Sequence, residues 1–212
     1  MTAHAPGSSV TGHSVLNLDR VFQAFPRLQT ERLVLRELRP SDSGSLFAIL
    51  SDEQVARFYD DEAFTDSSQA SEQIEAWDRA FDAWRSIRWG ITQRGTDEVI
   101  GTCGYYGFHR WHRRASLGYE LARPYWRQGI MTEALATIIG FGFRDFGLNR
   151  IQAVLMPWNV ASVKLLEKLG FRTEGLLRQY EKWRDKGIVD LLIYSLLRDE
   201  WERSRIYAQV PR

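Results

Sequence analysis

The sequence predicts one α/β domain built around a largely antiparallel sheet. Apolar residues alternate with polar ones in short runs, which is typical of strands, and recur at spacings of three and four in longer runs, which is typical of helices. In chain order these runs are a strand, two helices, three strands, a helix, a strand, a helix and two strands. That mixture indicates a single layered α/β fold with six to seven strands. The chain has 212 residues, 44% of them hydrophobic, and this length favours one domain.

The first half of the chain supplies four of the strands and two of the helices. A strand is expected at about residues 32–38, where Leu33 and Leu35 alternate with polar neighbours. Pro40-Ser41-Asp42 opens the first helix, and a second follows at about 67–85. Its apolar face consists of Ala70, Ile74, Trp77, Phe81 and Trp84. Strands are then expected at about 87–93, 99–106 and 115–122, the first two joined by a turn at 94–97.

The second half alternates helices with strands and ends in a hairpin. A helix is expected at about 129–146, a strand at 150–156 and a further helix at 159–169, closed by Gly170. Two strands at about 172–183 and 188–197 are joined by Asp185-Lys186-Gly187, and a helical turn at 199–205 follows them.

The two ends of the chain are expected to lie outside the packed domain. Residues 1–25 begin small and polar, and we interpret them as a loose tail that becomes ordered, if at all, near Val21, Phe22 and Phe25. The domain is assigned to residues 26–205, and residues 206–212 form a C-terminal tail. The first residues lack the cationic start and apolar centre of a secretory signal, so a cytoplasmic location is expected.

Composition excludes several classes of protein. With 28 Lys and Arg against 27 Asp and Glu, the chain carries no strong nucleic-acid signal. Its single cysteine, Cys103, excludes a disulfide framework and a multi-cysteine zinc site, and no metal is expected. No apolar run approaches the roughly 20 residues of a membrane span. The 8 Trp, 8 Tyr and 11 Phe imply a large core or an aromatic-lined groove, and they are compatible with a homodimer.

The stretch Leu121–Ala136 (LARPYWRQGIMTEALA) has the composition of an anion-binding turn. A strand ends there, a short loop follows, and a helix starts with its backbone N–H groups pointing outward. These donors and the helix dipole suit a phosphate or pyrophosphate, and Gly129 lets the backbone approach it closely. Arg127 and Gln128 add donors. The alternative is an ordinary strand-to-helix turn with glycine for steric reasons.

A second stretch, Asn159–Phe171 (NVASVKLLEKLGF), has the pattern of a capped helix. Asn159 can cap its start, while Val163, Leu166 and Leu169 form its buried face. Ser162 and Lys164 remain free for a ligand near the helix start. The alternative is that these residues serve only as a cap and as solvated charges.

Four segments together resemble one family. Trp126-Arg127-Gln128-Gly129-Ile130-Met131-Thr132-Glu133-Ala134-Leu135 looks like the acetyl-CoA pyrophosphate loop of the GNAT N-acetyltransferases, and Asn159…Ser162…Leu169-Gly170-Phe171 looks like their next helix. The opening LQTERLVLR at 28–36 and the ending Asp190…Tyr194-Ser195-Leu196 are similar to the RimJ/RimL-type subgroup, which includes enzymes that acetylate ribosomal protein N-termini. The resemblance covers about residues 26–202.

The resemblance implies a single-domain GNAT fold with helices on both faces of the sheet. The strands at 115–122 and 150–156 would splay apart, and the pantetheine arm of acetyl-CoA would lie between them, paired with backbone near Leu121 and Ala122. The pyrophosphate would bind the amides of Arg127, Gln128, Gly129, Ile130, Met131 and Thr132. Asn159 would hydrogen-bond the pantetheine, and Ser162 would lie near the thioester sulfur, with Lys164 also on the cofactor side.

The sequence departs from the family pattern at several positions. Trp126 stands where Arg or Gln is common, and Arg127 where Gly is common. The Tyr that many members use as general acid is Leu166 here, and the Glu that some ribosomal enzymes use as base is Val154. The CoA loop survives these changes because backbone groups do most of the phosphate binding. The catalytic assignment stays open.

Catalysis by direct attack of a neutral amine on the thioester needs a proton acceptor and a stabilised thiolate, but no covalent enzyme intermediate. Glu120 could accept the amine proton through water, or it could be a strand-face carboxylate paired with an Arg. Ser162 could stabilise the thiolate, or it could cap its helix. Tyr180 could face the substrate or donate a proton, or it could be a packed strand aromatic.

Charge is unevenly distributed along the chain. Residues 52–78 hold nine acids and one base, whereas residues 105–128 hold five Arg and one acid. The Arg block suits polyanionic CoA. In the family the acidic helices border the acceptor groove, so they would favour a cationic amine; the alternative is a solvated helix face. Trp111 and Trp183 are candidates for the mouth of that groove.

Two functions remain from the sequence. The first is acetyl transfer from acetyl-CoA to a primary amine, either a protein N-terminus or a small molecule, with Glu120, Ser162 and Tyr180 as candidate catalytic residues. The second is a non-catalytic CoA-binding or interaction module on the same scaffold. An RNA-binding role has only the Arg block in its favour.

Overall fold

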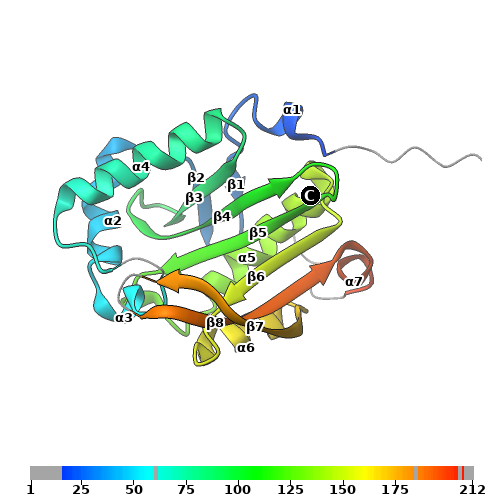
Figure 1. Cartoon of the computed structure of the whole chain (residues 1–212). Coiled ribbons are helices and arrows are strands. Elements are labelled where there is room, and N and C mark those ends of the chain that lie inside the picture. The colour runs from blue at the N-terminus through cyan, green and yellow to red at the C-terminus, as the bar shows by residue number, and fades with distance from the viewer. Residues whose placement is uncertain (1–15, 60–61, 184–185, 205–206, 208–212) are drawn as a thin grey trace, which may run out of the picture.

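The protein is built on one open sheet of eight strands. The structure, a computed structural model, describes residues 16–59, 62–183, 186–204 and 207. The strand order is β1-β2-β3-β4-β5-β6-β8-β7, and every neighbouring pair is antiparallel except β5 and β6 (Figure 1). The predicted mixed, mostly antiparallel sheet is therefore confirmed.

The strands match the predicted ones closely. They are β1 (Leu28–Gln29), β2 (Leu33–Arg36), β3 (Ser86–Gln93), β4 (Val99–His109), β5 (Arg114–Leu121), β6 (Arg150–Leu155), β7 (Arg172–Trp183) and β8 (Gly187–Leu197). The strand beyond the expected six to seven is β1, whose two residues are too few to show an alternating pattern.

Most helices differ from the predicted ones only at their ends, but two short helices, at Leu18–Val21 and Glu53–Ala56, were not predicted. The helices are α1 (Leu18–Val21), α2 (Ser43–Leu50), α3 (Glu53–Ala56), α4 (Ser67–Asp82), α5 (Ile130–Phe141), α6 (Val160–Lys168) and α7 (Arg198–Arg203). Short 3-10 turns lie at Pro40–Asp42 and Arg123–Tyr125, and a π-helical turn at Gly142–Phe146 continues α5. The helix expected to reach residue 85 ends at Asp82, because Trp84 adopts the left-handed conformation with φ 57°.

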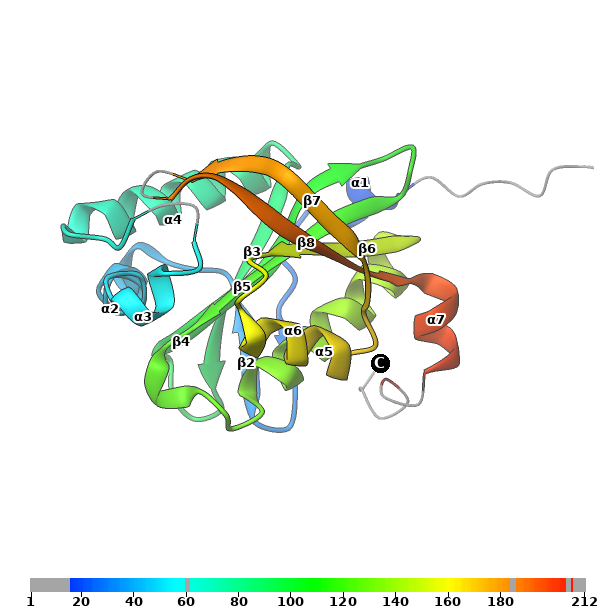
Figure 2. The same cartoon turned by 60° about the horizontal axis from the view of Figure 1, so that its bottom comes forward.

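Helices cover both faces of the sheet, as predicted (Figure 2). On one face, Ile87, Trp89 and Ile91 of β3 pack in the same core cluster as α5. On the other face, Leu38 and Val99 pack with α2 and α4 in a second cluster. The period of two along each strand produces this division, because successive side chains point to opposite faces. We call the two sides the α5 face and the α4 face.

The sheet opens between its two parallel strands. β5 and β6 pair only at Arg114–Arg150, Ala115–Ile151 and Ser116–Gln152. Beyond Ser116, β5 continues to Leu121 beside β4, while β6 continues to Leu155 beside β8. The predicted splay of these strands is therefore present, and it leaves one edge of β5 without a strand partner.

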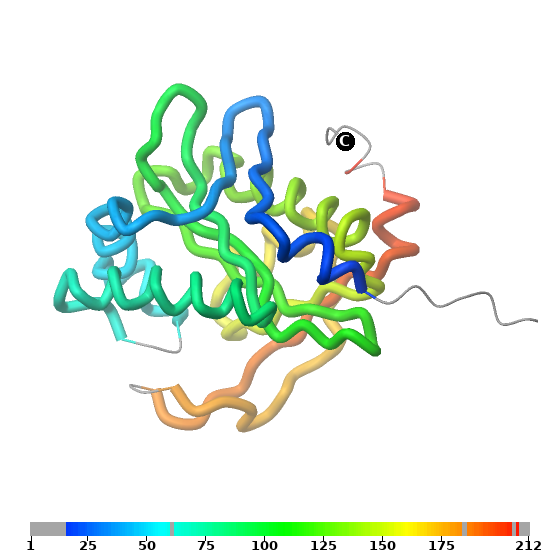
Figure 3. Tube along the Cα trace, turned by 90° about the horizontal axis from the view of Figure 1, so that it is seen from above, coloured from blue at the N-terminus to red at the C-terminus, as the bar shows by residue number. Residues whose placement is uncertain are grey.

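The N-terminal segment, interpreted as a loose tail that becomes ordered, if at all, near Val21, Phe22 and Phe25, packs against the domain from Leu16 onward. Leu16, Leu18 and Phe22 are buried in the core of the α5 face, and the Asn17 N–H donates to the Phe146 carbonyl at 3.0 Å. Phe22 also lies against Phe81, with ring centroids 5.0 Å apart, so α1 runs past the end of α4 (Figure 3). The packed domain therefore begins before residue 26, because these apolar side chains fill a gap that only the folded sheet creates.

At the C-terminus, the packed domain also extends beyond the predicted boundary at residue 205. Tyr207, in the segment expected to be a tail at 206–212, is buried, and its hydroxyl donates to the Leu169 carbonyl at 2.6 Å. Residues 1–15 and 208–212 lie outside the described residues. Among the residues that the structure describes, no helix combines the length and apolar character required to cross a bilayer.

Candidate active site

The turn between β5 and α5 is held in a left-handed conformation by local bonds. Arg127 has φ 61° and Gly129 has φ 75°, values that suit glycine and strain other residues. The Trp126 Nε1–H donates to the Leu121 carbonyl at 2.7 Å, and the Gln128 side-chain amide donates to the Pro124 carbonyl at 2.7 Å. The predicted phosphate loop is therefore a braced turn, with Trp126 and Gln128 as its braces.

The loop leads into a helix whose first amides have no intrahelical acceptor. The first helical bond runs from the Glu133 N–H to the Gly129 carbonyl, and no side chain caps the helix start. The N–H groups of Ile130, Met131 and Thr132 thus lie in the uncapped first turn, at the positive end of the helix dipole. The side chains of Ile130 and Met131 are buried, so only their backbone can meet a ligand. This arrangement fits a pyrophosphate.

One edge of β5 presents backbone groups to the splay. The Ala122 N–H donates to the Ile100 carbonyl on β4, and antiparallel strands alternate the direction of their peptide groups. The backbone groups of Tyr119 and Leu121 therefore point away from β4, toward the open side. The Leu121 carbonyl already accepts from the Trp126 Nε1–H, so its N–H is the group left for the pantetheine pairing that the resemblance implies. Ala122 is not placed as expected, since its carbonyl accepts from Tyr125 and its N–H is already bound to Ile100.

The start of α6 lies across the splay from β5. The Asn159 side-chain oxygen accepts from the Ser162 N–H at 3.2 Å, so Asn159 caps this helix. Burial raises the pKa of the Tyr119 hydroxyl to about 12, and a side-chain hydrogen bond with Ser162 opposes that shift. Lys164 is exposed, and Leu166 is buried in the core. The structure therefore brings Ser162 to Tyr119, a residue that the sequence analysis did not assign.

Glu120 lies on the face of β5 opposite to Tyr119, within a buried polar network. Its carboxylate accepts from the Tyr59 hydroxyl, the Thr102 hydroxyl and Nη2 of Arg88, and its side chain is 1% exposed. The Arg88 Nε–H donates to the Thr102 hydroxyl at 2.6 Å, and Nη2 donates to the Tyr59 hydroxyl at 3.1 Å. Of the two interpretations of Glu120, the observed arrangement is the ion pair with an Arg. The Glu120 carboxylate oxygens are therefore engaged by three protein donors.

The rest of the network comes from segments far apart in the chain. The Arg88 guanidinium lies 5.1 Å from the centre of the Trp77 ring on α4. Burial is the largest single cause and disfavours its charged form, but the charges of Glu120 and other neighbouring groups together outweigh burial, so the pKa of Arg88 is raised. Burial and the Glu120 charge together raise the pKa of Tyr59 well above its usual value. Sequence reasoning missed Tyr59 and Arg88, because no local pattern connects them to Glu120.

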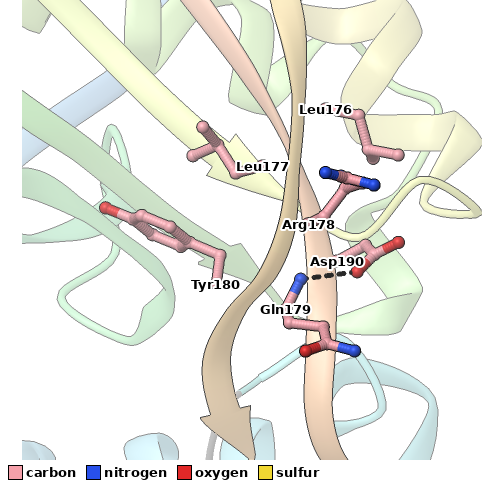
Figure 4. Close-up of a pocket in the computed structure, with 6 residues that line it drawn as sticks. All are labelled: Leu176, Leu177, Arg178, Gln179, Tyr180 and Asp190. Carbon is pink, nitrogen blue, oxygen red and sulfur yellow. Dashed lines mark hydrogen bonds between the residues drawn. The ribbon is translucent and has the colours of Figure 1, made fainter.

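Tyr180 lies on an irregular stretch of β7 and is not packed. The pairing of β7 with β8 shifts between Leu177 and Glu181, and Gln179 has φ 47°. The Asp190 side chain on β8 accepts from the Gln179 N–H at 2.7 Å. A depression of about 630 Å³ surrounds this bulge, lined by Leu176, Leu177, Arg178, Gln179, Tyr180 and Asp190 (Figure 4). Tyr180 is 56% exposed, which contradicts its interpretation as a packed aromatic.

The bulge faces the same side of the sheet as Glu120. Leu177 pairs with Leu191, and cross-strand partners share a face. Leu191 packs in a cluster with Trp183 and Phe58, which follows α3. Tyr180 extends to the same side of the hairpin as Leu177 (Figure 4). Trp183, expected at the mouth of a groove, is instead buried in that cluster, while Trp111 is exposed at the β4–β5 turn.

Two histidines and the single cysteine lie outside the groups described above. His109 and His112 stack with ring centroids 4.1 Å apart, and the His112 N–H donates to Nδ1 of His109 at 3.2 Å. Among the described residues, no group of three His, Cys, Asp or Glu side chains is arranged to hold a metal ion. Cys103 is buried in the core, which raises the pKa of its thiol.

Known proteins are similar to this chain both in sequence and in fold. Residues 32–172 match the family described as "Acetyltransferase (GNAT) domain". The uncharacterized N-acetyltransferase YoaA of Bacillus subtilis is 39% identical over 174 residues, which cover 82% of this chain and 98% of YoaA. The ribosomal protein uS5-alanine N-acetyltransferase of Escherichia coli is 33% identical over 107 residues, covering 48% of this chain and 55% of that enzyme.

A solved structure with a similar fold contains CoA-disulfide. Mycobacterium smegmatis RimJ in complex with CoA-disulfide superposes with a TM-score of 0.73 at 25% identity, covering 82% of this chain and 86% of RimJ. The splayed sheet, the loop before α5 and these similarities all indicate the same family. The chain belongs to the GNAT acetyltransferase family and is an N-acetyltransferase.

Proposed function

We propose that the protein transfers the acetyl group of acetyl-CoA to the primary amine at a protein N-terminus by direct attack of the amine on the thioester. The observation that carries this proposal is the splay between β5 and β6, which has the uncapped start of α5 at its side and the start of α6 across it. A thioester held there can be reached from the α4 face, where the acceptor would bind.

The cofactor would be held mainly by backbone groups. The amides of residues 127–132, with Ile130, Met131 and Thr132 in the uncapped helical turn, would bind the pyrophosphate. The backbone of Tyr119 and Leu121 would pair with the pantetheine arm. Asn159 and Ser162, at the start of α6, would complete the site. When bound, acetyl-CoA supplies an activated acyl group on a thiolate leaving group.

The chemistry that remains for side chains is limited. The Ser162 hydroxyl is suited to donate a hydrogen bond to the departing thiolate, as expected from its place at the helix start. Glu120, already occupied by three donors, acts as a positioning residue that holds Arg88 and Tyr59 on the α4 face. The proton of the amine then leaves to water, and the acceptor site lies between this network and Tyr180.

The acceptor class rests on the relatives. The E. coli relative is named for acetylating the alanine of ribosomal protein uS5, and another from Bacillus subtilis is named a putative ribosomal N-acetyltransferase. The open, polar depression at the β7 bulge is suited to an extended peptide better than to a buried small molecule. We therefore favour a protein N-terminus over a small amine.

The test is release of free CoA thiol from acetyl-CoA with matched acceptors. The panel pairs peptides that carry free N-termini with the same peptides blocked at the N-terminus, and adds small primary amines. Release with free but not blocked peptides supports the proposal. Release only with small amines would show that the acceptor is a small amine and not a protein N-terminus. Tight CoA binding without release from any acceptor would favour the non-catalytic module.

A further inference from the structure

Arg32 reaches from the turn between β1 and β2 to the loop before α5. Its Nε–H donates to Oε2 of Glu133 at 2.6 Å, and its Nη1–H donates to the Gln128 carbonyl at 3.1 Å. Its Nη2 lies 3.5 Å from the point where a Cβ would stand on Gly129. The guanidinium is half exposed, at 49%. Two of its three nitrogens are thus fixed by the loop and the helix, and the third lies beside the glycine of the loop.

Glu133 explains why a cation is needed at this place. It lies in the first turn of α5, close to the amides proposed to bind pyrophosphate. Burial favours its neutral form, yet hydrogen bonds from Thr30 and Arg32 outweigh burial and hold its pKa below the usual value. The carboxylate is therefore charged at neutral pH and, left alone, would repel a phosphate a turn away. Arg32 cancels that charge and carries donors on the loop side.

We propose that Arg32 is a phosphate-binding residue of the CoA site, in which Nε and Nη1 anchor the guanidinium while Nη2 binds the pyrophosphate. This inference rests on the proposed binding of acetyl-CoA between β5 and β6. Because the side chain is already fixed by two hydrogen bonds, little rotamer entropy is lost when the ligand binds. Arg127, in contrast, is exposed on the loop, and no hydrogen bond of its side chain is found among the described residues.

The experiment measures binding by calorimetry, so it needs no acceptor. Two ligands are compared: CoA, and pantetheine, which lacks the phosphates. Arg32→Ala is expected to weaken CoA binding by about ten- to hundredfold, the scale of a charge-assisted hydrogen bond, and to leave pantetheine binding unchanged. Arg32→Lys keeps the charge but lacks the planar guanidinium with its several donors, so its CoA affinity should fall less than that of Arg32→Ala. Arg79→Ala, which removes a somewhat more exposed cation from α4 (66% against 49% for Arg32), is the control and should change neither.

Glu133 separates a direct contact from simple charge cancellation. Glu133→Gln should bind CoA at least as tightly as the wild type, because an acid near the phosphate is gone. The double variant Arg32→Ala/Glu133→Gln should stay weaker than Glu133→Gln by about ten- to hundredfold, since the phosphate contact is still missing. Recovery of wild-type affinity in the double variant would overturn the contact.

Two further outcomes would also overturn it. Equal losses for CoA and pantetheine in Arg32→Ala would show that Arg32 only shapes the loop. Unchanged CoA affinity in Arg32→Ala, with the wild type binding CoA, would refute the inference while leaving the proposed function intact. Failure of the wild type to bind CoA at all would instead refute the proposed function.

Discussion

The two faces of the sheet are built in different ways. On the α5 face, the loop before α5 is made by consecutive residues, and the groups proposed to bind the cofactor are the backbone amides of residues 127–132. On the α4 face, Glu120 is held by Tyr59, Arg88 and Thr102, whose side chains come from three separate segments. The difference teaches that the cofactor side depends on local conformation, whereas the acceptor side depends on long-range packing. Substitutions should therefore affect ligand binding on one side and stability on the other.

The largest expected effect is the loss of the carboxylate on the α4 face. Glu120→Ala should destabilise the protein by about 3–5 kcal/mol, because it leaves the Arg88 charge buried without a partner. Chemical denaturation measures this free energy of unfolding. Glu75→Ala, which breaks the exposed pair with Arg79, is the matched control and should cost only about 0.5 kcal/mol. Similar costs for the two variants would contradict the structural role of Glu120.

The matching change on the α5 face is Gly129→Val. A β-branched side chain at φ 75° distorts the loop and would lie against Arg32, so CoA affinity should fall by about ten- to hundredfold, or 1.4–2.8 kcal/mol. Calorimetric titration with CoA measures the change. Gly95→Val, at φ 87° in the open β3–β4 turn, imposes similar strain away from the site. It should cost stability without altering CoA affinity, and an equal loss of affinity in both variants would show a global effect.

A smaller effect is expected at the β7 bulge. Tyr180→Ala should raise the KM for a peptide acceptor by about tenfold and leave CoA affinity and stability unchanged, because its ring is exposed in the depression. Steady-state kinetics at saturating acetyl-CoA measure this change. Ile188→Ala, on the neighbouring strand and outside the depression, is the control. If both variants behave like the wild type, the acceptor does not contact this bulge.

The smallest effect concerns an ion pair between β6 and β7. The Arg150 guanidinium binds both oxygens of Glu174 at 2.6 Å, and with the Ser195 hydroxyl it lowers the pKa of Glu174 from 4.5 to about 2. A lowered folded-state pKa adds stability that is complete above pH 4.5 and is lost as the pH falls toward 2. The contribution is modest, because the carboxylate is 41% exposed. Urea unfolding across this range should show a shallower loss for Glu174→Gln, and an identical pH dependence would exclude the assignment.

Short-range signals predicted most of the fold. The alternation at Leu33 and Leu35, the turn at 94–97 and the cap at Asn159 each depend on neighbouring residues, so their elements appear where expected. The prediction failed where packing decides conformation. Leu16, Leu18 and Tyr207 are ordered by contact with a core that exists only after folding, and Trp84 leaves its helix despite an ideal spacing.

The amino-acid sequence by itself determined the conformation of the loop before α5, since a glycine between a strand and an uncapped helix is a local pattern with a local conformation. It also determined the splayed strands, through the family resemblance of consecutive segments. Only the tertiary structure decided that Glu120 is ion-paired with Arg88, that Tyr180 is exposed and that Arg32 lies at the loop. The pairs Arg32–Glu133 and Arg88–Glu120 are 101 and 32 residues apart, and no local interaction can specify such contacts.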